Sequence, residues 1–184
     1  MTFNLSLAVI AVILGWLTLL SKNCVIKIIT GLLWILFLPN TIYMVTDIRH
    51  LPDQFLNAGS IMGILLVLQY TILMILAVMA FILALYPVDR IIQEKLSVKI
   101  RYLLLLFIMY SCSLGILLGL TYRLHSVDAF FRLPFVLSKL LELTSNLRNI
   151  QIIIFSGTLL FVLYVICSMR MFPIHKKGKR KKTK

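Results

Sequence analysis

Charged side chains are scarce in this sequence. Only 14% of its 184 residues are charged, and six of them are acidic, whereas about 25% of a typical soluble domain is charged. Hydrophobic residues make up 61% and the mean hydropathy is +1.01. A chain this short cannot bury so much apolar surface inside a water-facing globule. We therefore expect a single transmembrane domain over residues 1–172, covered by the lipid bilayer and without a soluble domain.

Cysteines and nucleotide-binding motifs are also nearly absent. The three cysteines, Cys24, Cys112 and Cys167, stand singly in or beside apolar runs, which excludes a disulfide framework and a metal-ligand spacing. No glycine-rich elbow surrounds Ser126, as a serine nucleophile of the hydrolase type would require. We find no phosphate-binding glycine loop and no internal repeat, and we expect no cofactor.

Five apolar runs occupy most of the chain. A spanning helix needs about 20 mostly apolar residues, so the runs predict an all-α, polytopic fold with about five transmembrane helices: 5–20, 25–38, 61–86, 102–120 and 150–169. A signal peptide has a basic region before its apolar run and a cleavage site after it. The first run has neither, so we expect a retained helix. Between the runs we expect a loop at 51–59, a charged connection with a short amphipathic helix at 87–101, and an interfacial helix within 130–149.

The second run is interrupted by Pro39. Proline removes a backbone hydrogen bond from a helix and disfavours helical geometry in the residue before it. The helix can therefore end at Pro39, or it can kink there and continue through Val45. A break at membrane depth is tolerated only where protein or a water-filled cavity covers it.

The distribution of Lys and Arg predicts the orientation. The net charge is +13, and seven basic residues lie within 176–184, after the last apolar run. That placement indicates a disordered cytoplasmic tail, 173–184, rather than a nucleic-acid site. Cytoplasmic loops carry the excess of Lys and Arg; with the tail inside, 14 basic residues lie inside and five outside. We therefore expect the N-terminus outside and the C-terminus inside.

Two polar clusters then fall on the extracytoplasmic side. The candidate functional residues are Asn40, Tyr43, Thr46, Asp47, His50, Arg123, His125, Ser126 and Asp128. Asp and His three residues apart share a helical face, and two such pairs have the chemistry for a divalent metal or for acid–base catalysis. Arg123 has the geometry to bind an anionic headgroup. The same residues can instead cap helices and form ordinary ion pairs at the interface.

Three further residues are predicted to pack helices. Gly115 and Gly119 have the small-xxx-small spacing that allows two helices to approach closely, and Gln69, inside the third run, needs a hydrogen-bond partner from another helix.

The two clusters also carry a family resemblance. Residues 37–51, FLPNTIYMVTDIRHL, resemble the signature of a bacterial integral-membrane family, domain of unknown function 1361, which runs roughly F-L-P-N-A-P-Y-x-[VI]-T-D-[LI]-x-H-L. Residues 115–128 resemble in part the family's second block, G-[IV]-Y-x-G-R-[FY]-x-R-W-N-S-W-[DE]. The agreeing residues include Gly115, Gly119, Arg123, Ser126 and Asp128.

The resemblance implies a multi-pass protein of the bacterial plasma membrane without an assigned activity. The family pattern has Asn where this chain has His125, and Arg where it has Leu120. A four-ligand Asp/His metal site would therefore not be a family trait, and we expect no metal.

We expect a non-enzymatic membrane component that binds a partner or ligand at an extracytoplasmic polar site, with a membrane-protein partner or a second copy of the chain as further partners. The alternative is a membrane-embedded enzyme that acts on lipid or a lipid-linked substrate through Asp/His acid–base chemistry.

Overall fold

A computed structural model describes residues 2–124 and 126–171, and within these ranges the chain is all helical, with no strand, so the predicted all-α class is confirmed. The predicted tail, 173–184, lies outside the described residues. The elements are α1 (Thr2–Leu20), α2 (Cys24–Phe37), α3 (Pro39–Tyr43), the 3₁₀ helix η1 (Met44–His50), α4 (Leu51–Leu56), α5 (Ser60–Lys95), α6 (Val98–Tyr122), α7 (Asp128–Phe131), α8 (Leu133–Ser145) and α9 (Leu147–Met171).

Four helical stretches of the described chain are long and apolar enough to cross a membrane. They are Cys24–Leu56, Ser60–Lys95, Val98–Tyr122 and Leu147–Ser168. The fifth apolar helix, Asn4–Leu20, is shorter, about 26 Å at 1.5 Å per residue, against a hydrocarbon core of about 30 Å.

The helical path continues through Pro39. Leu38 keeps helical backbone angles, and Pro39 is the first residue of α3, a position where no backbone N–H is required. The Thr41 hydroxyl donates to the Leu38 carbonyl at 2.7 Å. Of the two alternatives at Pro39, the structure has the continuing one, and the path extends beyond Val45 through η1 and α4. The loop predicted at 51–59 is thus wrong over Leu51–Leu56, which is helical.

The predicted charged connection at 87–101 is also wrong. Helix α5 passes through Pro87 and ends at Lys95, and α6 begins only three residues later, at Val98. Asp89 and Arg101, which we expected in a solvated connection, are buried at 4% and 8% exposure. Their mutual ion pair, described below, is the physical reason that helix can replace loop here.

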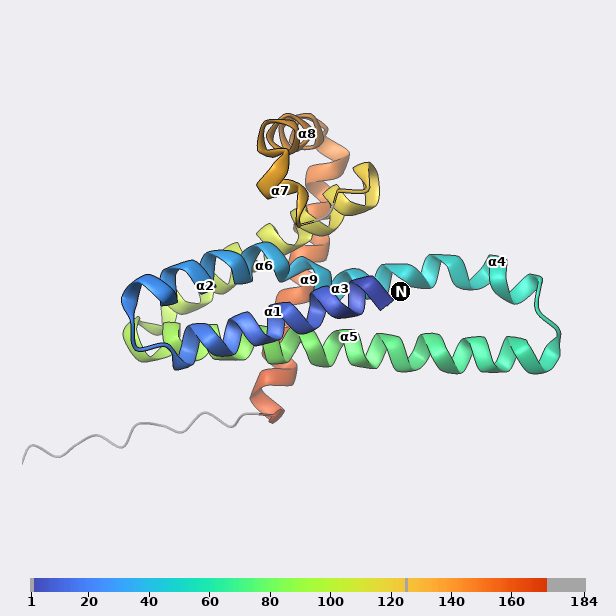
Figure 1. The fold of residues 1–184 in the computed structure, drawn as a ribbon, viewed down its shortest axis with the longest axis horizontal. Coiled ribbons are helices and arrows are strands. Elements are labelled where there is room, and N and C mark those ends of the chain that lie inside the picture. Colours follow the sequence, from blue (N-terminus) through green and yellow to red (C-terminus); the bar gives the residue numbers. More distant parts are fainter. Residues whose placement is uncertain (1, 125, 172–184) are drawn as a thin grey trace, which may run out of the picture.

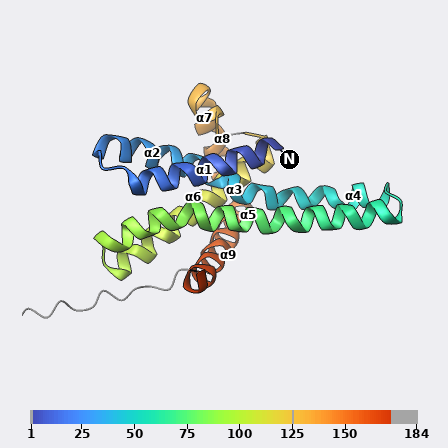
Figure 2. The ribbon, with the colours of Figure 1, turned by 60° about the horizontal axis from the view of Figure 1, so that its bottom comes forward.

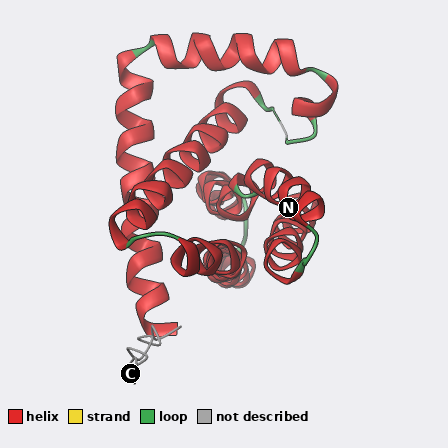
Figure 3. Cartoon of the chain, turned by 90° about the vertical axis from the view of Figure 1, so that its left-hand side faces the viewer, coloured by secondary structure: helices red, strands yellow, loops and turns green. Residues whose placement is uncertain are grey.

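The long helices form a hairpin with a crossing arm. The stretch from α2 to α4 leads to the hairpin's turn, and α5 returns beside α4, η1 and α3, while α1 packs against α2, α3 and α5 (Figures 1 and 2). Helix α6 packs against α9, which crosses the hairpin steeply (Figures 1 and 3). Helices α7 and α8, in the region where we predicted an interfacial helix, lie beyond the end of α6.

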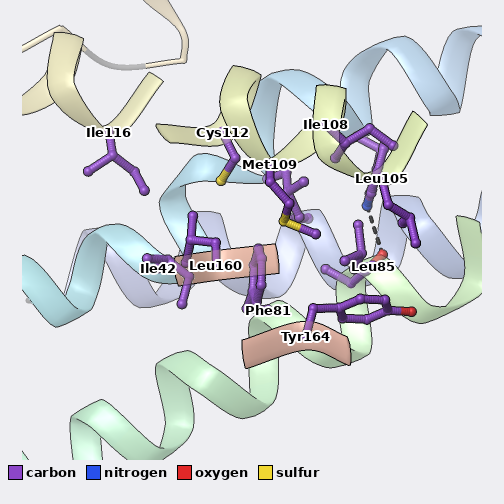
Figure 4. Close-up of a cluster of buried hydrophobic side chains, with 14 residues drawn as sticks. Ile42, Phe81, Leu85, Leu105, Ile108, Met109, Cys112, Ile116, Leu160 and Tyr164 are labelled. Atoms are coloured by element: carbon purple, nitrogen blue, oxygen red, sulfur yellow. Dashed lines mark hydrogen bonds between the residues drawn. The ribbon is translucent and has the colours of Figure 1, made fainter. Parts of the chain in front are cut away.

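One apolar cluster joins the hairpin to α6 and α9. Phe81 and Leu85 of α5 meet Leu105 and Met109 of α6 and Tyr164 of α9, all fully buried (Figure 4). The Trp34 indole donates to the Ala84 carbonyl at 2.8 Å within this cluster. Many large apolar side chains elsewhere on α5 and α9 are exposed, as lipid-facing residues of a membrane protein are.

Candidate functional site

The two sequence segments singled out above contact each other where α3 crosses α6. Gly115 faces the ring of Pro39, and Gly119 faces the ring of Tyr43. A Cβ atom on Gly115 would lie 2.7 Å from Pro39 Cγ, and one on Gly119 would lie 2.8 Å from Tyr43 Cε2. The absence of side chains at both positions is therefore what lets α3 approach α6 this closely.

Hydrogen bonds fix the same contact. Asn40 Nδ2 donates to Ser126 Oγ at 2.7 Å and to the Phe37 carbonyl at 3.0 Å, and the Ser126 hydroxyl donates to the Leu36 carbonyl at 2.7 Å. The Tyr43 hydroxyl donates to the Gly119 carbonyl at 3.4 Å. Asn40 is only 8% exposed. The 86 residues that separate Asn40 from Ser126 make this link a product of tertiary structure.

A pocket of about 220 Å³ lies beside these bonds. Its walls come from α2, α3, α6, α7 and α8 and from the connection after α6, and they are mostly apolar. Its polar side chains are Asn40, Tyr43, Ser111 and Ser126. Both sequence segments therefore line one cavity.

Helix α8 contributes Val136 and Leu140 to the pocket wall, and its polar face is tied to the end of α6. Lys139 Nζ donates to the Glu142 carboxylate at 2.7 Å, and the Tyr122 hydroxyl also bonds to Glu142. These two hydrogen bonds lower the pKa of Glu142 below its usual range, and the bond from Lys139 has the larger effect. The same bond to Glu142 raises the pKa of Lys139.

The remaining candidates lie away from the pocket lining. Thr46 donates to the Tyr43 carbonyl at 2.6 Å, and Arg49 Nε donates to Nε2 of the exposed His50 at 3.2 Å. Asp47, in η1, is partly exposed and, like His50, is not among the residues that line the pocket.

At the second segment, Arg123 is exposed and ends α6 with a left-handed backbone, φ 55°. Asp128 begins α7 and is partly exposed. His125 lies outside the described residues. Among the residues that are described, no group of three or more His, Cys, Asp or Glu side chains is arranged to hold a metal ion.

Gln69 is exposed on α5. Tyr70 is 3% exposed and donates to Oε1 of Gln54, in α4, at 3.2 Å.

Sequence reasoning missed a buried ionic cluster. Arg101 Nε and Nη2 donate to the two carboxylate oxygens of Asp89, each at 2.7 Å, and the Tyr164 hydroxyl donates to Asp89 Oδ2 at 2.7 Å. The cluster joins α5, α6 and α9. Helical periodicity could have indicated that Asp89 is buried, since Asp89 continues the spacing of the buried residues Ile82 and Leu85.

These features define the class, a multi-pass helical membrane protein with an interhelical pocket. A family model described as "Protein of unknown function (DUF1361)" matches residues 3–166. The chain belongs to this family, and the resemblance seen in its two segments is confirmed. No curated protein and no solved structure matches the chain.

Proposed function

We propose that this protein is a non-enzymatic membrane component that binds an amphipathic, lipid-type molecule in the pocket between α3, α6 and α8. The observation that carries the proposal is that both family segments line this one cavity. A pocket formed where helices of a bundle meet, mostly apolar with a few placed polar groups, is the usual form of a small-molecule site.

Its location suits a lipid. The surrounding helices expose large apolar side chains, among them Leu32 on α2 and Phe107 on α6, at 66% and 65% exposure, so the apolar chain of a ligand can lie against apolar helix surfaces. The distribution of Lys and Arg supports a position of the pocket on the extracytoplasmic side of a bacterial plasma membrane.

The alternative, an acid–base enzyme, receives less support. A general base must lie within hydrogen-bond reach of the proton that it removes, either directly or through one water. The pocket lining contains no Asp, Glu or His among the described residues. Of the candidates for this chemistry, Asp47, His50 and Asp128 do not line the pocket, and His125 lies outside the described residues.

Filling the pocket tests the proposal. Ser111 lines it from α6, so Ser111→Phe should occupy the space that a ligand needs, while Ser111→Ala leaves that space open. Native mass spectrometry of protein extracted from its membrane should show bound lipid on the wild type and on Ser111→Ala, and about tenfold less on Ser111→Phe.

Val136→Phe fills the same pocket from α8 and should reproduce the loss, which guards against a local folding defect in one variant. Equal lipid occupancy in both filled variants and the wild type would contradict the proposal.

A further inference from the structure

The pocket wall contains a hydrogen-bond acceptor that no described residue satisfies. Both observed bonds of the Asn40 amide use Nδ2. One of them goes to the Phe37 carbonyl, which can only accept, so the nitrogen must be the atom on that side and the oxygen must lie on the other. Asn40 Oδ1 is therefore the atom that can still accept a hydrogen bond.

That oxygen belongs to a side chain in the wall of the cavity. Every fully buried side-chain nitrogen or oxygen in the described part of the chain has a hydrogen-bond partner. No described residue donates to Oδ1, although Asn40 is only 8% exposed. Asn40 lines the pocket, so a ligand in the pocket can donate to this oxygen.

The neighbouring polar groups of the pocket can also accept hydrogen bonds from a ligand. The Ser126 hydroxyl proton is used on the Leu36 carbonyl and the Tyr43 hydroxyl proton on the Gly119 carbonyl, so each oxygen has only lone pairs to offer. Ser111 adds one hydroxyl. No Lys or Arg is among the lining residues, and Lys139 on α8 is paired with Glu142.

From this we infer that the occupant is an uncharged single-chain lipid with a hydroxyl headgroup, such as a monoacylglycerol or a long-chain alcohol. The inference rests on the proposed function. A hydroxyl can donate to Asn40 Oδ1, whereas an ionised carboxylate only accepts and would be buried without a cation, which is costly.

The size of the pocket is consistent with a headgroup and the first part of a chain. Its volume of about 220 Å³ is below the roughly 300–1,000 Å³ of sites that enclose a drug-sized ligand. The rest of the chain would lie among the apolar side chains that α2 and α6 expose.

Three probes with the same acyl chain test the inference: the monoacylglycerol, the free fatty acid and the methyl ester. Each is titrated onto the purified full-length protein in nanodiscs, with occupancy measured by native mass spectrometry. We expect the monoacylglycerol to bind about tenfold more tightly than either of the others, the ratio that one net hydrogen bond of ~1.4 kcal/mol gives.

Variants locate the effect. Asn40→Leu, of similar size, removes this acceptor and should abolish most of the preference for the monoacylglycerol over the methyl ester. Thr41→Val is the matched control, because Thr41 is also buried on α3 but is not among the residues that line the pocket, and it should keep the tenfold preference. If Asn40→Leu does not fold, the three probes on the wild type still decide.

The outcomes separate the two proposals. Equal binding of all three probes to the wild type, or tighter binding of the fatty acid, overturns the hydroxyl headgroup but leaves a lipid-binding pocket. Binding of none of them overturns both.

Discussion

At the scale of single residues, the site depends on side chains that are small or absent. Gly115 and Gly119 of α6 leave room for the rings of Pro39 and Tyr43, and the close approach brings Asn40 within 2.7 Å of Ser126. One residue has a backbone conformation that residues with a side chain rarely adopt. Arg123 ends α6 at φ 55°, a conformation in which a side chain is strained.

Gly115→Ala should destabilise the protein. The added methyl group meets the rigid Pro39 ring, and overpacking of this kind costs about 1–3 kcal/mol, more than the ~1 kcal/mol that alanine gains in a helix. The measurement is thermal unfolding in detergent. Gly31→Ala on α2, whose new methyl would lie at an ordinary 3.7 Å from its neighbour, should be neutral or stabilising. Similar behaviour of both variants would contradict the packing argument.

Arg123→Gly should stabilise the protein by about 1–2 kcal/mol, because glycine adopts the left-handed conformation without strain. Arg123→Ala removes the same charge but keeps a Cβ, so it should give no such gain. Thermal unfolding of the two variants side by side distinguishes relief of backbone strain from loss of charge, since a gain shared by both would point to the charge.

At the scale of elements, charged groups hold helices together at two places. The buried Asp89–Arg101 pair joins α5, α6 and, through Tyr164, α9. Near solvent, Glu142 of α8 pairs with Lys139 of the same helix and is hydrogen-bonded to Tyr122 at the end of α6. Because the first pair is buried and the second is near solvent, we expect the first to contribute much more to the free energy of unfolding.

Asp89→Asn should cost about 3–5 kcal/mol, because it leaves Arg101 buried without its counter-charge. The matched control is Glu94→Gln, which breaks the half-exposed Arg90–Glu94 pair on α5 and should cost less than about 1 kcal/mol.

Replacing both buried partners, as in Asp89→Leu with Arg101→Met, should recover much of the loss. Denaturant unfolding in detergent measures all four proteins. An Asp89→Asn cost no larger than that of Glu94→Gln would show that the cluster is not structural.

The α8 contact should weaken in acid. Because the pKa of Glu142 is lowered in the folded protein, the contact stabilises the protein above the ordinary Glu pKa of about 4.3 and is lost as the pH falls through the lowered value. The difference in Tm between the wild type and Glu142→Gln should therefore be present at neutral pH and shrink once the pH is below about 4. A difference that does not change with pH would contradict the role of this carboxylate.

At the scale of the whole molecule, the open question is orientation in the membrane. Of the basic residues assigned to the inside, Arg101 is buried in an ion pair and does not act as a loop charge. The expectation of an outside N-terminus and an inside C-terminus then rests more heavily on the basic segment 176–184.

We expect cysteines placed at Asp47 and Asp128 to be labelled in intact cells by an impermeant thiol reagent. The background lacks the native cysteines, of which Cys112 is buried and Cys24 is exposed. Both sites are partly exposed in the fold, so access should be decided by the side of the membrane. Labelling only after permeabilisation would invert the topology, and labelling of one site alone would place the two clusters on different sides.

Much of this protein could be predicted from local sequence. Apolar runs indicate membrane helices because hydropathy adds along the chain, and residues 37–51 and 115–128 identified the family. Where prediction failed, at 51–59 and 87–101, polar residues and prolines suggested loops. Both segments are largely helical, since Pro52 lies in the first turn of α4, where proline is tolerated, and the Asp89 carboxylate is neutralised by Arg101.

The sequence by itself determined the class, the family and the residues worth testing. Only the tertiary structure decided that Asn40 meets Ser126, that a pocket opens beside them, and that Asp89 and Arg101 are buried together. The physical reason is that burying a polar or charged group depends on a partner from another part of the fold, and no local pattern identifies that partner.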